Sequence, residues 1–376
     1  MITVPFFDLG ALVARSLDEV EVAIGRVLRS GQFIGGPTVE QFESEFADYL
    51  GVRHCIGVAN GLDALRLALE ANKIGPGDEV IVPAFTFYAT LLSVMQTGAI
   101  PVSVDVLRDS ANIDPLAIEA AITERTRAIV VVHLYGQSAD MGTILGIARK
   151  HSLSIFEDTA QSHGAASDVG LAGTVGLAGA FSFYPTKNLG ALGDAGAVTT
   201  SDDGVAAIVR SRRSYGQGAT KYDHVDSGWN SRLDPIQAAV LSVHLTHLDE
   251  WNTRRRSIAS SYLNALGDRA SAVVGPQDAS RSVWHHFVLR AKDRAGLQEH
   301  LAFCGVATDV HYPYAAYDLE PVKMHIATSG SVVPHPVADS LSREVTSFPI
   351  GPWMTDAQVE AVADALSRVP DELLNA

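Results

Sequence analysis

The sequence has few cysteines and fewer basic than acidic residues. Cys55 and Cys304 are the only cysteines in 376 residues, and they lie far apart without the spacing of a metal site. This usage is typical of a reducing compartment and argues against a disulfide framework. The 43 acidic residues outnumber the 28 lysines and arginines, giving a net charge of −15. General nucleic-acid binding is therefore disfavoured, because a phosphate backbone would be repelled.

Long uncharged apolar runs are also missing. None reaches the roughly 18 residues of a membrane-spanning helix, and the start MITVPFFDLG lacks the regions of a secretory signal. We therefore expect a cytoplasmic protein with no membrane partner. The one basic cluster, residues 254–256, lies in a helical pattern and is expected to form a solvated face. With 47% hydrophobic and 19% charged residues, the composition predicts a folded globular chain rather than disorder.

Apolar runs alternate with helical patterns from about residue 55 to 200. The runs are EVIVPAF, PVSVDV, RAIVVVHLYG, LSIFEDTA, GAFSFYP and GAVTTSD. Both faces of these runs are apolar, which predicts a mostly parallel sheet covered by helices. Asn60 is placed to cap a helix that follows it, and Asp114 with Pro115 opens another. The fold class predicted for this part is α/β.

The pattern changes after about residue 234. Asp234 and Pro235 open a helix expected to run over residues 235–266, too long for a simple crossover. A strand in WHHFVLR, a helix in AGLQEHLAF, a strand in VATDV and a final helix follow. Thr355 and Gln358 form the capping-box pattern of that last helix. We expect a large domain over residues 1–240 and a smaller α+β domain over residues 241–376, with an exposed loop near Ser329.

Lys187 lies between an apolar run and a glycine-rich loop, in FSFYPTKNLGALGDAG. A lysine in such a turn can simply be solvated. It becomes a nucleophile near neutral pH if burial disfavours its charged form. The glycines around it would let a ligand approach the backbone closely.

Asp158 follows a buried apolar run in FEDTAQSHG, at the place where open α/β sheets bind ligands. It could be a helix cap. It could also pair with a cationic heterocycle, because a buried carboxylate needs a cation or hydrogen-bond donors. Pyridoxal phosphate requires such a partner at its ring nitrogen and a lysine at its aldehyde. The pairing of Asp158 with Lys187 is the signal for this cofactor.

A phosphate group could bind where VANGLDALRLAL turns into a helix. The amides of Gly61 and Leu62 would face the anion there, although Gly61 could instead only form a turn. Phe87, in PAFTFYAT, could cover a bound ring or belong to the core. The spacing of Gly190, Gly193 and Gly196 resembles a dinucleotide fingerprint, but it precedes a strand-like run and not a helix, so this interpretation fails.

Six segments in order give the chain a family resemblance. They are NGLDALRLAL, GPGDEVIVPAFTFYAT, VVHLYGQSADM, EDTAQSHGA, FSFYPTKNLGALGDAGAV and NSRLDPIQAAVL. Together they resemble the sugar aminotransferases of the DegT/DnrJ/EryC1/StrS family, which have the type I fold of pyridoxal-phosphate enzymes. The resemblance covers nearly the whole chain. It departs from the family pattern in ANG, where SG is commoner, and in VGLAGTVG.

The resemblance implies a role for each matching residue. Lys187 would bond to the cofactor and shuttle the proton, and Asp158 would pair with the ring nitrogen. The other implied cofactor contacts are Gln161 at the phenolic oxygen, Ser182, Gly61 and Leu62 at the phosphate, and Phe87 stacked on the ring. Asn230 would reach the phosphate of a neighbouring subunit, which implies a homodimer with shared active sites. The family's 3-dehydratases have histidine in place of Lys187, so the resemblance favours an aminotransferase.

The implied reaction moves an amino group from L-glutamate to a keto-sugar attached to a nucleoside diphosphate. GWNSRLDPIQAAVL, VHLYGQ and HYPY are similar to enzymes that act at C3, which suggests a thymidine-diphosphate 3-keto-6-deoxyhexose. A 4-aminotransferase remains the alternative. A non-catalytic regulator that binds the cofactor or the nucleotide sugar is a third possibility.

Five further residues are candidates for contact with the sugar. They are His163, Trp284, His286, His311 and Tyr312. Each could instead be a hydrogen-bonded packing residue, because histidines beside apolar residues usually are.

Overall fold

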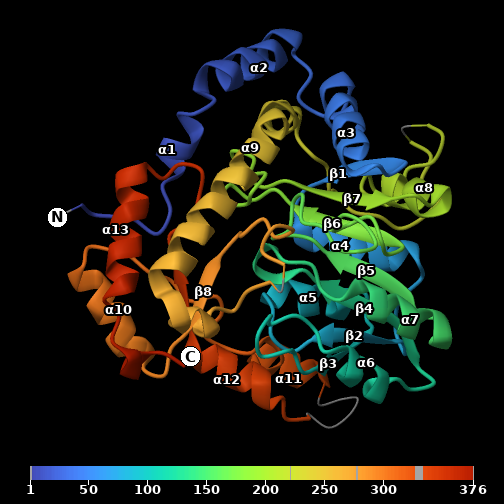
Figure 1. The fold of residues 1–376 in the computed structure, drawn as a ribbon. Helices are drawn as coiled ribbons and strands as arrows, with labels where there is room; N and C mark the ends of the chain where they lie inside the picture. The colour runs from blue at the N-terminus through green and yellow to red at the C-terminus, as the bar shows by residue number, and fades with distance from the viewer. Residues whose placement is uncertain (1, 221, 277, 327–332, 376) are drawn as a thin grey trace.

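A seven-stranded sheet forms the centre of the computed structural model, which describes residues 2–220, 222–276, 278–326 and 333–375 (Figure 1). The strands are β1 (His54–Val58), β2 (Glu79–Pro83), β3 (Ile100–Val104), β4 (Thr126–Val132), β5 (Ser154–Asp158), β6 (Ala178–Ser182) and β7 (Gly196–Thr200). Their order is β1-β7-β6-β5-β4-β2-β3. β7 pairs antiparallel with β1 and β6, and the other neighbours are parallel.

This sheet confirms the predicted α/β class and all six predicted strands. β1 was not predicted, because His54 and Gly57 interrupt its apolar pattern. β1 lies at the edge of the sheet and is paired with β7 alone. Its pairing partner is about 140 residues away in the sequence, so no local signal announces it.

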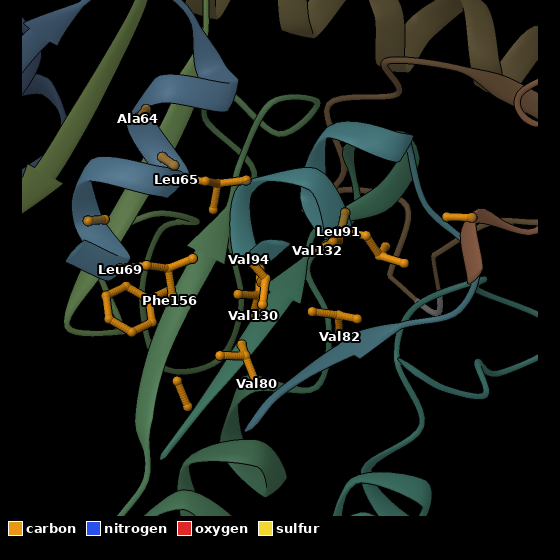
Figure 2. Close-up of a cluster of buried hydrophobic side chains, with 14 of the residues drawn as sticks. Ala64, Leu65, Leu69, Val80, Val82, Leu91, Val94, Val130, Val132 and Phe156 are labelled. Atoms are coloured by element: carbon orange, nitrogen blue, oxygen red, sulfur yellow. The ribbon is translucent and has the colours of Figure 1, made fainter. Parts of the chain in front are cut away.

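Helices cover both faces of the sheet. α4 (Gly61–Ala71) and α5 (Tyr88–Gln96) pack on one face, and α6 (Pro115–Ala121) and α7 (Met141–His151) pack on the other. Figure 2 shows the first of these contacts, in which Val80 and Val82 of β2 point toward α4 and α5. Ile81, between them, belongs to the cluster on the opposite face. Burying each such side chain contributes roughly 1.5–3 kcal/mol, so the alternation fixes which helix covers which face.

The remaining helices of the first part lie around the sheet edge and the long helix. They are α1 (Leu9–Val13), α2 (Leu17–Ser30), α3 (Pro37–Leu50) and α8 (Asp203–Arg212). The long helix α9 (Pro235–Leu266) has the predicted bounds and runs from the sheet to the second part of the chain (Figure 1). The boundary expected at residue 240 falls inside α9, and the division into two domains stays a prediction.

The second part contains a two-stranded antiparallel sheet, β8 (Phe287–Arg290) with β9 (Val345–Phe348). Its helices are α10 (Arg294–Phe303), α11 (Glu320–Ile326), α12 (Pro336–Glu344) and α13 (Asp356–Ser367). The predicted capping box of Thr355 and Gln358 is confirmed. The predicted strand in VATDV is wrong: it forms only isolated bridges, from Val306 to Val4 and from Asp309 to Ser347. Ser329, in the predicted exposed loop, lies outside the described residues.

The N-terminal segment packs on the second part of the chain. Val4 and Leu12 are buried in a core formed mainly by residues from 251 onward. The basic cluster requires a correction, because Arg255 is only 2% exposed and not part of a solvated face. It turns inward from α9 and donates to backbone carbonyls. In the described part of the chain, no helix combines the length and apolar character needed to cross a membrane.

Candidate active site

A cavity of about 800 Å³ opens at the carboxyl ends of the parallel strands. Its wall includes the last residues of β4, β5 and β6, the start of α4, the N-terminal segment and residues from the second part of the chain. Ten of the predicted site residues line it: Gly61, Leu62, Phe87, Asp158, Gln161, Ser182, Lys187, His286, His311 and Tyr312. His163, Trp284 and Asn230 are not among the residues that line it.

Lys187 projects into the cavity from the turn after β6. Its backbone amide donates to the carbonyl of Tyr184 at 2.8 Å, which closes this turn. Within the described residues, no carboxylate lies within 4.0 Å of its Nζ. Burial lowers the pKa of Lys187 to about 8, although the negative charge of Asp158 acts in the opposite direction. About a tenth of the amine is therefore neutral at pH 7, far more than for an ordinary lysine, and this neutral form is what a nucleophile or base requires.

Asp158 ends β5 and is 7% exposed. Its Oδ2 accepts a hydrogen bond from Thr90 Oγ1 at 2.8 Å, and its Oδ1 accepts one from the amide of Ala160 at 3.2 Å. Burial raises the pKa of Asp158, while these two bonds lower it. A carboxylate with two neutral donors in a buried wall would gain from a cationic partner. The sequence analysis did not identify Thr90, although it lies in the same PAFTFYAT segment as Phe87.

Gln161 connects two sides of the cavity. Its Oε1 accepts from the amide of Tyr135 at 2.7 Å, and its Nε2 donates to the hydroxyl of Tyr312 at 3.0 Å. The ring of Tyr312 lies 5.6 Å from that of Phe87, between centroids. Phe87 is 57% exposed at the start of α5, so its ring is open to a ligand.

The start of α4 offers a site for an anion. Asn60 caps the helix, because its Oδ1 accepts from the amide of Asp63 at 2.8 Å. The amides of Gly61 and Leu62 lie in the first turn and have no acceptor within the helix. A Cβ on Gly61 would lie 2.6 Å from Cβ of Ser182, so only glycine lets this turn approach the end of β6. The amides, the helix dipole and the Ser182 hydroxyl together suit a phosphate group. We refer to Gly61, Asp158, Ser182 and Lys187 as the sheet wall.

Three aromatic rings form the facing side of the cavity. His286 and His311 are stacked with centroids 3.9 Å apart, and Phe6 lies 5.6 Å from His311. Burial lowers the pKa of His311 to about 4 and that of His286 well below its usual value. Both imidazoles are therefore neutral at pH 7. We refer to Phe6, His286 and His311 as the histidine wall.

The remaining predicted site residues lie elsewhere. His163 is fully buried, and its Nε2 donates to the carbonyl of Ser182 at 3.0 Å. Trp284 is buried against Phe287, with ring centroids 5.6 Å apart. Asn230 is exposed and forms an isolated bridge with Ser214. Their suggested contacts with substrate or with a neighbouring subunit stay predictions.

Glu157 is a further buried acid that the sequence analysis did not single out. It is fully buried beneath the cavity and accepts from His133 Nε2 at 2.9 Å. It also accepts from three backbone amides of the loop 173–176. Burial raises the pKa of Glu157, but these donors outweigh it and lower the pKa overall. Glu157 therefore fixes the VGLAGTVG loop, whose geometry the sequence left open.

The cavity fits pyridoxal phosphate. One wall carries an amine with a lowered pKa, a buried carboxylate short of a cation, and a helix start with unpaired amides. These are the three groups that the aldehyde, the ring nitrogen and the phosphate require. The described residues contain no cluster of three or more histidine, cysteine or acidic side chains that could hold a metal ion.

Comparisons with known proteins agree with this geometry. Residues 16–367 match the model of the DegT/DnrJ/EryC1/StrS aminotransferase family. A Streptomyces venezuelae protein named dTDP-3-amino-3,4,6-trideoxy-alpha-D-glucose transaminase is 46% identical over 96% of this chain and 95% of its own length. An Aneurinibacillus thermoaerophilus protein named dTDP-3-amino-3,6-dideoxy-alpha-D-galactopyranose transaminase is 46% identical over 97% of this chain and 99% of its own. The crystal structure of NtdA from Bacillus subtilis with bound pyridoxamine phosphate superposes with a TM-score of 0.90, at 30% identity, over 97% of this chain and 85% of that one.

Proposed function

Because the chain belongs to the DegT/DnrJ/EryC1/StrS aminotransferase family, we propose that it moves the amino group of L-glutamate to C3 of a dTDP-linked 3-keto-6-deoxyhexose. The class of enzyme, a pyridoxal-phosphate-dependent aminotransferase of nucleotide sugars, follows from the family and from relatives that match nearly the full chain. Position C3 is supported by two relatives at 46% identity, both named for 3-amino sugars.

The observation that carries the proposal is the composition of the sheet wall. Lys187, Asp158 and the start of α4 come from three separate segments and line one cavity. When bound there, pyridoxal phosphate supplies an electron sink for the electrons released as a proton leaves the donor's α-carbon. Nothing else in the cavity wall explains why a lysine with a lowered pKa and a buried aspartate face the same space.

Each residue of the sheet wall then has a definite task. Nζ of Lys187, with a pKa of about 8, accepts a proton at neutral pH and can return it in the second half of the reaction. Asp158 would hold the ring nitrogen of the cofactor, where its negative charge would favour the protonated form of that nitrogen. Thr90 and the amide of Ala160 orient this carboxylate. The amides of Gly61 and Leu62 and the hydroxyl of Ser182 would hold the phosphate.

The charge of the cavity supports a shared site. Of the described residues that line it, Lys187 is the only lysine or arginine. L-Glutamate brings two carboxylates and the nucleotide brings two phosphates, so further positive or donor groups are required. A second copy of the chain could supply them from the segment around Asn230, which is exposed here. We therefore infer a homodimer in which Asn230 reaches the phosphate of the partner's cofactor.

Complementation tests the shared site. Lys187→Ala and Asn230→Ala are each expected to be inactive or weak as homodimers. In a mixed dimer, one site contains both substitutions and the other contains neither, so co-expression should restore about half of the specific activity per mixed dimer. A lack of recovery in mixed dimers confirmed by mass would contradict the assignment of Asn230.

Two half-reactions test the function itself. L-Glutamate alone should convert the bound cofactor to its aminated form and release one equivalent of 2-oxoglutarate. The aminated enzyme should then lose its amine to dTDP-3-keto-6-deoxyhexose, and NMR of the product should place nitrogen at C3. Nitrogen at C4 would establish the alternative 4-aminotransferase, and cofactor binding without either half-reaction would favour a regulator.

A further inference from the structure

Tyr135 has an unusual backbone for a bulky residue. It lies in the turn after β4 with φ 59° and ψ 9°, in the left-handed region that disfavours side chains with a Cβ. Such conformations persist only when surrounding contacts hold them, and they are concentrated at functional sites. Tyr135 is 2% exposed, so its contacts are with protein groups and not with bulk solvent.

Three polar groups of Tyr135 contact the cavity wall. Its amide donates to Gln161 Oε1 at 2.7 Å, and its carbonyl accepts from the amide of His286 at 3.4 Å. Its hydroxyl donates to the backbone carbonyl of His311. Its ring meets that of His286 edge-on, at 6.1 Å between centroids. One residue of the turn thus touches Gln161 and both histidines of the histidine wall.

Gly136, the next residue, packs closely against the segment before β8. Gly136 has φ 94°, and a Cβ there would lie 2.6 Å from the amide nitrogen of His285 and 2.9 Å from that of Trp284. Its carbonyl accepts from the amide of Val283 at 2.8 Å. Trp284 also has a left-handed backbone, with φ 43°. Two turns in unfavourable conformations therefore hold each other in place.

Arg255 secures the same segment from the other side. Its Nη1 donates to the carbonyls of Trp284, His285 and Ile350 at 3.0–3.3 Å. No carboxylate of a described residue forms an ion pair with it. Because a buried guanidinium is costly to desolvate, these three carbonyls fix where the segment can lie.

The histidine wall is chemically suited to an uncharged sugar ring. Its two imidazoles are neutral at pH 7, stacked, and flanked by Phe6, and the described lining residues near them include no arginine. Neutral imidazoles donate to and accept from hydroxyl groups but attract carboxylates and diphosphates weakly. His311 is also fixed at its Nδ1, which lies 2.9 Å from Ser347 Oγ.

We propose that Tyr135 is a positioning residue that holds His286 and His311 against the hexose of the nucleotide sugar, and that its hydroxyl takes no part in the reaction with glutamate. The proposal rests on the proposed function. It assigns specificity for the second substrate to a residue that forms no hydrogen bond with Lys187 or Asp158.

Tyr135→Phe tests it, because the ring is kept and only the hydroxyl is lost. Loss of one such hydrogen bond should raise the KM for the keto-sugar about 3- to 10-fold with little change in kcat. The rate and the KM of the glutamate half-reaction should stay within about twofold of wild type. Ser347→Ala removes the hydrogen bond between Ser347 Oγ and His311 Nδ1, so it should likewise raise the KM for the keto-sugar and leave the glutamate half-reaction unchanged.

The matched control is Tyr317→Phe. The hydroxyl of Tyr317 donates to Asp339 at 2.7 Å, and neither residue lines the cavity. This variant should change neither half-reaction. The proposal is overturned if Tyr135→Phe and Ser347→Ala affect both half-reactions equally, or if neither changes the KM for the sugar. A wild-type enzyme that fails to react with glutamate would instead sink the proposed function.

Discussion

The sheet wall and the histidine wall enclose one cavity but are built in different ways. Asp158 and Ser182 end parallel strands, Lys187 follows a strand by five residues, and Gly61 begins a helix. The histidine wall joins the N-terminal segment, the segment before β8 and the residues before η3 (Ala316–Asp318). Local sequence therefore determines the first wall, whereas the second depends on contacts between distant segments.

We expect the two walls to act on the two substrates differently. The sheet wall should serve both half-reactions, since each uses the cofactor. The histidine wall should affect only the reaction with the sugar. Substitutions in the two walls therefore test whether the half-reactions can be affected separately.

Lys187→Ala should have the largest effect. Removal of the covalent partner and the base should lower turnover at least about 1,000-fold in both half-reactions. The visible absorption band of the lysine-bound cofactor should be absent after addition of pyridoxal phosphate, while circular dichroism stays unchanged. A retained band would show that another amine holds the cofactor.

Asp158→Asn should cause the second-largest loss of turnover. The amide keeps the shape and can still meet Thr90, but it removes the charge that holds the ring nitrogen protonated. We expect turnover to fall about 100-fold or more in both half-reactions. Single-turnover absorbance with L-glutamate measures this, and Thr355→Ala, which changes no residue that lines the cavity, serves as control. Loss confined to the sugar half-reaction would contradict the assigned role.

The pH dependence of cofactor capture should reveal the state of Lys187. Its folded pKa is lowered to about 8, so the neutral amine dominates above that pH and is lost below it. The rate at which apo-enzyme captures pyridoxal phosphate should rise about tenfold per pH unit up to about 8 and then level off. Asp158→Asn should move the break to lower pH, because that carboxylate raises the pKa of Lys187. A break near 10 would indicate an ordinary solvated lysine.

His311→Ala should have a smaller and selective effect. It removes a ring that stacks on His286 and a hydrogen-bonding group of the histidine wall. We expect kcat/KM for the keto-sugar to fall about 10-fold, while the glutamate half-reaction changes less than about twofold. Stopped-flow measurement of each half-reaction separates the two, and equal losses would mean that both walls serve both substrates.

Thr355→Ala should change stability alone. Thr355 caps α13 through the amide of Gln358 at 3.2 Å, and the loss of such a cap costs about 1 kcal/mol. Thermal unfolding should show a lower midpoint, with both half-reactions unchanged at 25 °C. A change in either rate would show that α13 influences the cavity.

The contrast between local and distant contacts in the two walls explains how much of the site could be predicted. Lys187, Asp158 and Gly61 each adjoin a strand end or helix start that the sequence marks by periodicity and capping residues. Phe6 and Tyr135 carry no such mark. Phe6 reaches the cavity because Val4 pairs with Val306, and the turn at Tyr135 is fixed by the distant His311 and Val283. His163 and Trp284 are buried in the core, which the sequence did not indicate, and their contact with the sugar stays a prediction.

The neighbouring acids of β5 have a consequence for assembly of the protein. Glu157 and Asp158 point to opposite faces of the strand, one tied to the loop below and the other open to the cavity. A slip of one residue in the pairing of β5 would turn each side chain to the other face. In one direction Asp158 would meet the amides arranged for a longer side chain and Thr159 would face the cavity; in the other, Glu157 would face the cavity and Phe156 would meet the amides. The hydrogen bonds that Glu157 accepts from the loop thus favour the correct register of β5. A chain with the wrong register would lose both the catalytic carboxylate and these bonds to the loop.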